Sequence, residues 1–203
     1  MHKEILSQEQ LSLLSLVKEF KTNYYLVGGT AIALYLGHRK SIDFDLFSTK
    51  PISHTRIIAT IKKYGYSITK TLIKNENELT IIIDGVKFTF LYFPFNINGT
   101  VSILPGVKSL ELIELGALKA YAIGRRSKWK DYVDMYLLLK NHFSISQISL
   151  KADEIFSGAF NEKIFREQLC YFEDIDYTEE VDYIGINQNQ ENIKDYLLKI
   201  ATV

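Results

Sequence analysis

The sequence predicts an α+β fold, in which a mixed β-sheet with flanking helices is followed by a helical C-terminal region. Short apolar strands alternate with amphipathic segments up to about residue 105, and Asp84-Gly85 is a strong signal for a tight hairpin between two strands. From Ser109 onward the apolar residues recur at helical spacing. We therefore expect an α+β domain over residues 1–105 and a helical domain over residues 106–203.

The first domain should contain five strands and three helices. The strands are predicted over Tyr24–Val27, Asp43–Phe47, Tyr66–Ile73, Glu78–Ile83 and Val86–Phe93. The first helix, over residues 6–20, should bury a stripe formed by Leu11, Leu14, Val17 and Phe20. The second helix follows the N-cap candidate Thr30 and stops at Gly37. The third is capped by Ser53 and ends near Gly65.

The second domain should be helical throughout. One helix is expected over residues 110–122, with Gly124 ending it, and another over residues 129–139. Three more helices are expected to begin at Ser146, Asn161 and Gln190. The acidic run Glu173–Asp182 is predicted to be a loop.

Composition limits the class of protein. The chain has 203 residues, 47% of them hydrophobic, which suits a globular protein with a substantial core. No apolar run approaches the roughly 20 residues that span a bilayer, so we expect no membrane partner. The charged N-terminus lacks the apolar stretch of a signal peptide, and Cys170 is the only cysteine, which excludes an intrachain disulfide. These features predict a cytoplasmic location.

The net charge of zero conceals an uneven distribution. Residues 1–150 carry 19 Lys and Arg against 12 Asp and Glu, whereas residues 151–203 carry 5 against 12. A basic body suits an anionic partner such as a nucleotide or a nucleic acid. The acidic end either keeps a helical surface in water or shields the basic body, and the sequence leaves both readings open.

Two short motifs carry chemistry. Gly28-Gly29-Thr30 opens a helix, where backbone N–H groups and the helix dipole favour a phosphate group. Asp43 and Asp45 alternate on a strand with apolar neighbours, so both carboxylates project from one face, roughly 7 Å apart, and can share a divalent cation such as Mg²⁺ or Mn²⁺. Together the motifs indicate a site for a nucleoside triphosphate (NTP) and its metal ion.

The run from His38 to Leu46, with Gly28-Gly29-Thr30 before it, resembles the first motif of the AbiEii-type nucleotidyltransferase toxins, which belong to the DNA-polymerase-β-like superfamily. Lys119, Arg125 and the run Lys130-Asp131-Tyr132-Val133-Asp134 are similar to the helical motif of that family. The resemblance covers about Tyr24 to Leu139. It implies a nucleotidyltransferase-like sheet and a helical domain that completes the active-site cleft.

The resemblance implies transfer of a nucleoside monophosphate from NTP to an acceptor, the 3′ end of a tRNA, by a toxin with an antitoxin partner. The catalytic candidates are Asp43, Asp45, Lys119 and Asp131, with both strand aspartates as metal ligands. The nucleotide-binding candidates are Gly28, Gly29, Thr30, Arg39, Ser41 and Arg125. A purely structural salt-bridge network remains an alternative for Lys119 and Asp131. The basic run 125–130 could hold RNA, with Trp129 either stacking on a base or buried in the core.

Thr89 departs from the family pattern. The family usually carries Ile-Asp on the strand before a proline, where this chain has Phe88-Thr89 ahead of Pro94. A hydroxyl is a weak metal ligand and a poor base. Either another group takes over the role, or transfer is slow, or the chain is a catalytically impaired nucleotide-binding or protein-interaction module. Asp84 is a nearby carboxylate, but the hairpin explains it more simply.

Overall fold

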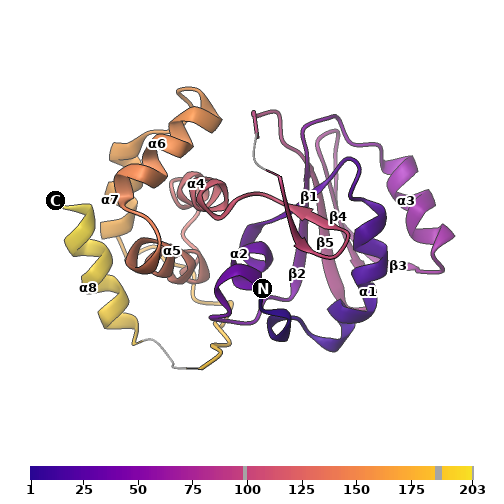
Figure 1. Cartoon of the computed structure of the whole chain (residues 1–203), viewed down its shortest axis with the longest axis horizontal. Helices are drawn as coiled ribbons and strands as arrows, with labels where there is room; N and C mark the ends of the chain where they lie inside the picture. Colours follow the sequence, from indigo (N-terminus) through magenta and orange to yellow (C-terminus); the bar gives the residue numbers. More distant parts are fainter. Residues whose placement is uncertain (98–99, 186–188, 203) are drawn as a thin grey trace. The chain divides into compact units, whose positions relative to one another are not determined.

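The computed structural model describes residues 1–97, 100–185 and 189–202. The chain divides into two compact units, Met1–Leu110 and Glu111–Val203, coloured indigo to magenta and magenta to yellow in Figure 1. The first unit contains the sheet and the second contains helices, so the α+β fold class is confirmed. The expected boundary between residues 105 and 106 falls inside a β-hairpin, and the two units meet between Leu110 and Glu111.

A mixed sheet organises the first unit. Within the described residues it has seven strands in the order β3-β4-β5-β2-β1-β7-β6. Their bounds are Tyr25–Val27 (β1), Asp43–Ser48 (β2), Ile68–Lys74 (β3), Glu78–Ile83 (β4), Val86–Tyr92 (β5), Val101–Leu104 (β6) and Val107–Ser109 (β7). The β2–β5 and β1–β7 pairs are parallel, and the other pairs are antiparallel. The site motifs therefore lie on central strands.

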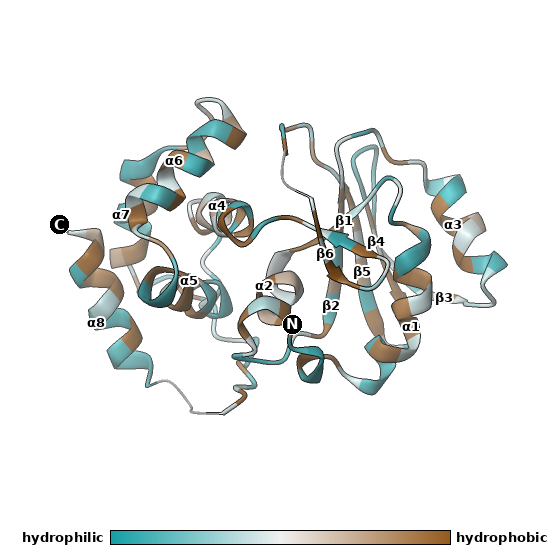
Figure 2. Cartoon of the chain, in the orientation of Figure 1, coloured by the Kyte–Doolittle hydropathy of each residue, from teal (hydrophilic) through white to brown (hydrophobic). Residues whose placement is uncertain are grey.

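Side-chain alternation places the core against the middle of the sheet. Phe44 and Leu46 on β2 are buried, and so are Phe88 and Phe90 on the adjacent β5. The rings of Phe44 and Phe88 pack with centroids 5.1 Å apart. Figure 2 shows these strands as alternating brown and pale or teal segments. The residues between the buried ones face the other side and carry the polar groups described below.

The helices of the first unit begin and end largely as expected. They are the 3₁₀ turn η1 (Lys3–Ile5), α1 (Gln8–Glu19), α2 (Gly28–Leu36) and α3 (His54–Lys63). Ser53 caps α3, and Gly37 ends α2 in the left-handed conformation. The expected stripe on α1 is partly wrong. Leu11 is exposed. The helix face that packs on the core contains Leu13, Leu16 and Val17, which have i, i+3, i+4 spacing and are buried.

The β6–β7 hairpin is not among the strands expected from the sequence. Its strands have only four and three residues, and they flank a Pro105-Gly106 turn that indicates a loop by composition. Gly106 has a φ of +79°, which glycine adopts without strain. The Ser109 hydroxyl donates a 2.6 Å hydrogen bond to the Leu26 carbonyl and fastens β7 to β1.

Five helices make up the described part of the second unit: α4 (Leu112–Ile123), α5 (Trp129–Asn141), α6 (Ile145–Phe156), α7 (Glu162–Cys170) and α8 (Gln190–Ala201). Gly124 caps α4 and Asn161 caps α7, as expected. The start of α6 differs, because Ser144 and Gln147 form a capping box two residues before Ser146. None of the helices in the described segments is long and apolar enough to cross a membrane.

Candidate active site

The turn from β1 into α2 brings a carboxylate against the main chain. Gly28 has a φ of +70°, and a Cβ at this position would lie 2.3 Å from Oδ2 of Asp45. A Cβ on Gly29 would lie 2.5 Å from Nη2 of Arg39. Each glycine therefore leaves space for one charged side chain to pack on the backbone, and a Cβ at either position would displace the end of that side chain.

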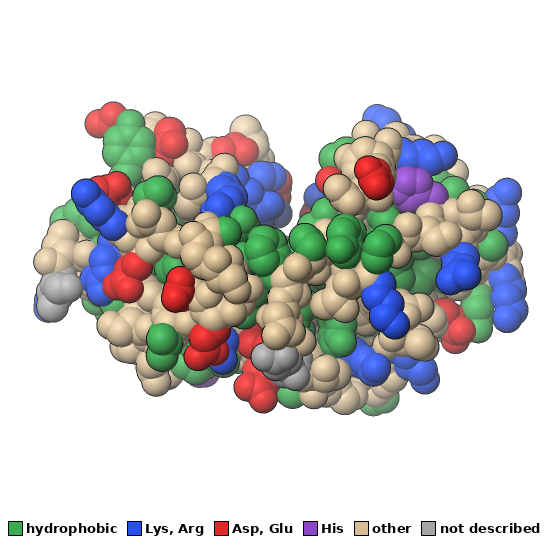
Figure 3. Space-filling model, turned by 90° about the horizontal axis from the view of Figure 1, so that it is seen from above, with side chains coloured by type: hydrophobic (Ala, Val, Ile, Leu, Met, Phe, Trp, Pro, Cys, Tyr) green, Lys and Arg blue, Asp and Glu red, His purple; other side chains and the backbone are tan. Residues whose placement is uncertain are grey.

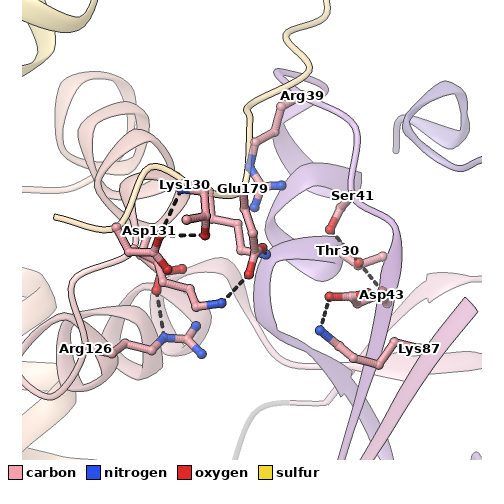
Figure 4. A network of polar contacts seen from close by, with 12 residues as sticks. Thr30, Arg39, Ser41, Asp43, Lys87, Arg126, Lys130, Asp131 and Glu179 are labelled. Atoms are coloured by element: carbon pink, nitrogen blue, oxygen red, sulfur yellow. Dashed lines mark hydrogen bonds and ion pairs between the residues drawn. The ribbon is translucent and has the colours of Figure 1, made fainter. Parts of the chain in front are cut away.

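Thr30 fastens α2 to the start of β2. Its hydroxyl donates to the main-chain carbonyl of Asp43 and lies 2.8 Å from Oγ of Ser41, as Figure 4 shows. The sequence-based assignment of Thr30 as the cap of α2 is wrong. The helix begins at Gly28, three residues earlier than a Thr30 cap would place it, and Val27 is at the N-cap without a side-chain hydrogen bond. Thr30 is buried and fixes the backbone that carries Asp43.

Four polar side chains occupy one face of the β2–β5 pair. Asp43 is in register with Lys87, and Asp45 is in register with Thr89. All four are half-buried, since they alternate with the buried phenylalanines. Nζ of Lys87 lies 2.6 Å from Oδ2 of Asp43. The sequence interpretation selects Thr89 but omits Lys87, although period-two alternation over Val86–Tyr92 puts both on one face.

The donor set of this face suits a hard divalent cation. Asp43 and Asp45 supply carboxylate oxygens, which Mg²⁺ and Mn²⁺ prefer, and Mg²⁺ is commonly held by one or two carboxylates together with substrate phosphates. No cluster of three or more His, Cys, Asp or Glu side chains with metal-binding geometry occurs among the described residues. The two carboxylates fit a divalent cation that would complete its shell with ligand and water oxygens.

A buried charge network crosses α4 and α5 in the second unit. Nζ of Lys119 lies 2.6 Å from Oδ1 of Asp131 and 2.9 Å from Oδ2 of Asp134. Nε of Arg126 donates to Oδ2 of Asp131 at 2.8 Å. Burial alone would raise the pKa of Asp131, but Lys119 and Arg126 hold that pKa below its ordinary value. The carboxylate is therefore ionised at neutral pH, and Lys119 lies buried between two aspartates.

Arg125 lies apart from this network. Its guanidinium stacks 3.4 Å from the Tyr121 ring centroid and donates to the carbonyls of Tyr121 and Ala159. Arg126, which the sequence interpretation does not select, is the arginine that contacts Asp131. Composition does not distinguish two neighbouring arginines at a helix end. Only the path of the chain after Gly124 determines that Arg125 and Arg126 point in different directions.

The acidic segment 173–182 contacts the start of α5. Glu179 forms ion pairs with Lys128 and Lys130, and these lower its pKa to about 2 although burial alone would raise it. Main-chain bonds also join Asp176 to Ser127 and Trp129. Trp129 is 3% exposed and packs near Tyr177, so in this structure it is a core residue and is not open for base stacking.

The surface charge follows the sequence asymmetry. On the face of the first unit shown in Figure 3, Lys and Arg side chains are more frequent than Asp and Glu and are spread out rather than gathered in one patch. In the second unit, Arg126, Lys128 and Lys130 are each paired with a carboxylate. The basic run 125–130 is therefore partly neutralised by its own unit.

The model of a known protein family matches most of this chain. Residues 13–197 match the family described as nucleotidyl transferase AbiEii toxin of type IV toxin–antitoxin systems. The match includes both the β1–α2 turn with its paired aspartates and the Lys119–Asp131 network. The chain belongs to this family. It is therefore a nucleotidyltransferase of a toxin family, as the motifs predicted.

Relatives of this AbiEii-family chain agree in extent and in fold. An uncharacterised protein of Aquifex aeolicus (strain VF5) is 29% identical over 184 residues, which cover 86% of this chain and 84% of that protein. Among solved structures, MenT4, a nucleotidyltransferase toxin of Mycobacterium tuberculosis H37Rv, has a TM-score of 0.62 at 9% identity and covers 95% of this chain and 81% of its own. JHP933 of Helicobacter pylori has a TM-score of 0.55 at 17% identity, over 97% and 92%. Because the identities are this low, the two structures show only that this chain shares their fold.

Proposed function

We propose that this AbiEii-family chain is a metal-dependent enzyme that transfers a nucleoside monophosphate from NTP to an RNA acceptor. The main support is the approach of the Asp45 carboxylate to the backbone of Gly28, where a Cβ would lie 2.3 Å from Oδ2. This approach puts a metal-ligand candidate beside the helix N-terminus, the type of backbone site that binds phosphate. A metal–triphosphate complex needs both at once.

Each residue of the first unit has a role in this proposal. Amides at the start of α2 would bind phosphate oxygens, while Thr30 and Ser41 would keep that turn in place. Arg39, packed on Gly29, would add charge-assisted hydrogen bonds to the same phosphates. Asp43 and Asp45 would hold Mg²⁺ or Mn²⁺, which when bound neutralises phosphate charge and orients the reacting phosphorus.

The assignments in the second unit depend on the family motif. We propose that Lys119 and Asp131 act in the reaction as a fixed ammonium–carboxylate pair, and that Arg125 contacts phosphate. The contacts of 2.6 Å and 2.9 Å support an ordered Lys119, but a purely structural network would have the same contacts. The conservative variant Lys119→Arg tests the role, because a structural role tolerates a retained positive charge better than a positioned ammonium does.

The acceptor and the partners are further parts of the proposal. A tRNA 3′ end suits a chain whose first 150 residues have an excess of basic groups. Membership of a toxin–antitoxin family favours an antitoxin that restrains the activity. A cytoplasmic location follows from the proposed substrates, since NTP and tRNA occur there.

The decisive experiment is labelling of RNA with an α-³²P-labelled NTP, one base at a time, with and without Mg²⁺. We expect Mg²⁺-dependent labelling by the wild-type chain and at least about a hundredfold loss in Asp45→Asn, since a missing metal ligand removes much of the charge stabilisation of the transition state. Asp84→Asn is the matched control. Asp84 lies in the β4–β5 turn at a φ of +47°, a conformation that Asn tolerates, so its labelling should be unchanged.

A second function, nucleotide binding without transfer, is favoured by Thr89, which lies beside Asp45 where a further carboxylate would be expected. Calorimetry with NTP and Mg²⁺ separates the two functions. Binding together with a blank labelling assay for all four bases would support the second function, and Asp45→Asn labelling at the wild-type rate would refute the role of Asp45.

A further inference from the structure

The β2–β5 face contains a cation of its own. Lys87 lies directly across from Asp43 on the neighbouring parallel strand, with its ammonium 2.6 Å from Oδ2 of that aspartate. The two side chains are only 34% and 19% exposed, so water screens the pair incompletely. The next position along β5 on this face is Thr89, which is neutral.

These two positions decide how many divalent cations the face can hold. In sites with two metal ions, the ions lie about 3.5–4 Å apart. Shared carboxylates bridge the two ions, so an acidic group is needed on each side of the pair. On the β2 side the face offers Asp43 and Asp45. On the β5 side it offers an ammonium and a hydroxyl, and an ammonium repels a second divalent cation from the Asp43 oxygen that it contacts.

We propose that Lys87 is a positioning residue that replaces the second metal ion of this site. In this proposal, which deepens the proposed transferase function, Lys87 holds Asp43 and supplies a fixed positive charge on the β5 side. A single divalent cation is then bound through Asp43 and Asp45 on the β2 side. Thr89 is compatible with this arrangement because no metal needs a carboxylate there.

The test counts bound Mn²⁺ by electron paramagnetic resonance of the free ion, with Mn²⁺ alone as the probe, so it does not depend on any activity. We expect one tight site per chain in the wild type. Thr89→Asp should still bind one, because Lys87 continues to occupy Asp43. The double variant Lys87→Met/Thr89→Asp should bind two. Lys87→Arg keeps the charge and should bind one.

One variant serves as a control, and specific Mn²⁺ counts would overturn the proposal. Lys108→Met removes an exposed lysine from β7 of the same sheet and should leave one site. Two tight sites in the wild type, or two in Thr89→Asp alone, would overturn the proposal, as would a double variant that is folded by circular dichroism and binds one. Two tight sites in the wild type or in Thr89→Asp would overturn the proposal even if the double variant does not fold. A blank labelling assay with the expected Mn²⁺ counts would reject the transferase and leave the one-cation face intact.

Discussion

At the residue scale, Gly28 has two separate constraints. Its positive φ disfavours any side chain, and its Cα also borders the Asp45 carboxylate. The second constraint is specific to the site. Gly85 in the β4–β5 turn has a similar φ of +80°, but a Cβ added there would meet no atom within 4 Å. A comparison of the two glycines therefore separates backbone strain from displacement of a functional carboxylate.

We predict that Gly28→Ala and Gly85→Ala each lower the free energy of unfolding by roughly 1–3 kcal/mol, the usual cost of a strained backbone conformation. Only Gly28→Ala should also lose tight Mn²⁺ binding, because the new methyl group must push Asp45 aside. Urea unfolding and Mn²⁺ titration measure the two effects. Equal Mn²⁺ affinity in both variants would show that Asp45 is not a ligand.

The residues that can be found from sequence are those whose partners are close along the chain. Asp43 and Asp45 are found because alternation on a single strand determines their shared face. Lys87 and Arg126 are missed because their partners belong to other elements, and a single strand or helix does not encode its register with a neighbour. Thr30 is misassigned for a related reason, since its hydroxyl bonds to a carbonyl 13 positions away rather than to its own helix.

At the element scale, the start of α5 is joined to segment 173–182. Glu179 contacts Lys128 and Lys130, and the Ser127 hydroxyl donates a 3.0 Å hydrogen bond to Asp174. These contacts connect an acidic segment without regular secondary structure to the first turn of a helix. The prediction of a loop is correct, but the attachment of that loop depends on contacts about 50 residues apart that composition does not reveal.

The Glu179 contacts predict a pH dependence. Its pKa is about 2 in the folded chain against an ordinary 4.5, so its contribution to stability is complete above pH 4.5 and is lost as the pH falls towards 2. Because Glu179 is 39% exposed, we expect that contribution to be below about 1 kcal/mol. The difference in unfolding free energy between the wild type and Glu179→Gln, measured in urea, should shrink over this range. The exposed neighbour Glu180 provides the control, since Glu180→Gln should show a smaller difference.

The elements that are predicted well have strong local signals. The Asp84-Gly85 turn joins Ile83 to Val86 as expected, and Ser53, Asn161 and Gly124 mark helix ends. The short strands β6 and β7 have no comparable signal. They have only four and three residues, and β7 becomes a strand because Leu26 of β1 provides a parallel partner. Tertiary pairing, rather than propensity, determines such strands.

At the scale of the whole molecule, the end of the first unit determines which fragment can fold. β7 lies between β1 and β6 in the sheet and ends at Ser109. We predict that a fragment of residues 1–110 unfolds cooperatively in urea. A fragment of residues 1–105, which lacks β7, should show a lower midpoint or no cooperative transition. Circular dichroism follows both, and equal midpoints would show that β7 is dispensable.

The parallel pairing of β2 with β5 has a consequence for the order of events during synthesis. Parallel strands cannot be joined by a tight turn, and here α3, β3 and β4 intervene between the two. A nascent chain can therefore complete the face of Asp43, Asp45, Lys87 and Thr89 only after Tyr92 has left the ribosome. Non-local pairing of this kind is slow relative to helix formation. Under the proposed function, a ribosome-bound chain with an incomplete β5 lacks Lys87 and Thr89 beside the paired aspartates and should not yet transfer nucleotides.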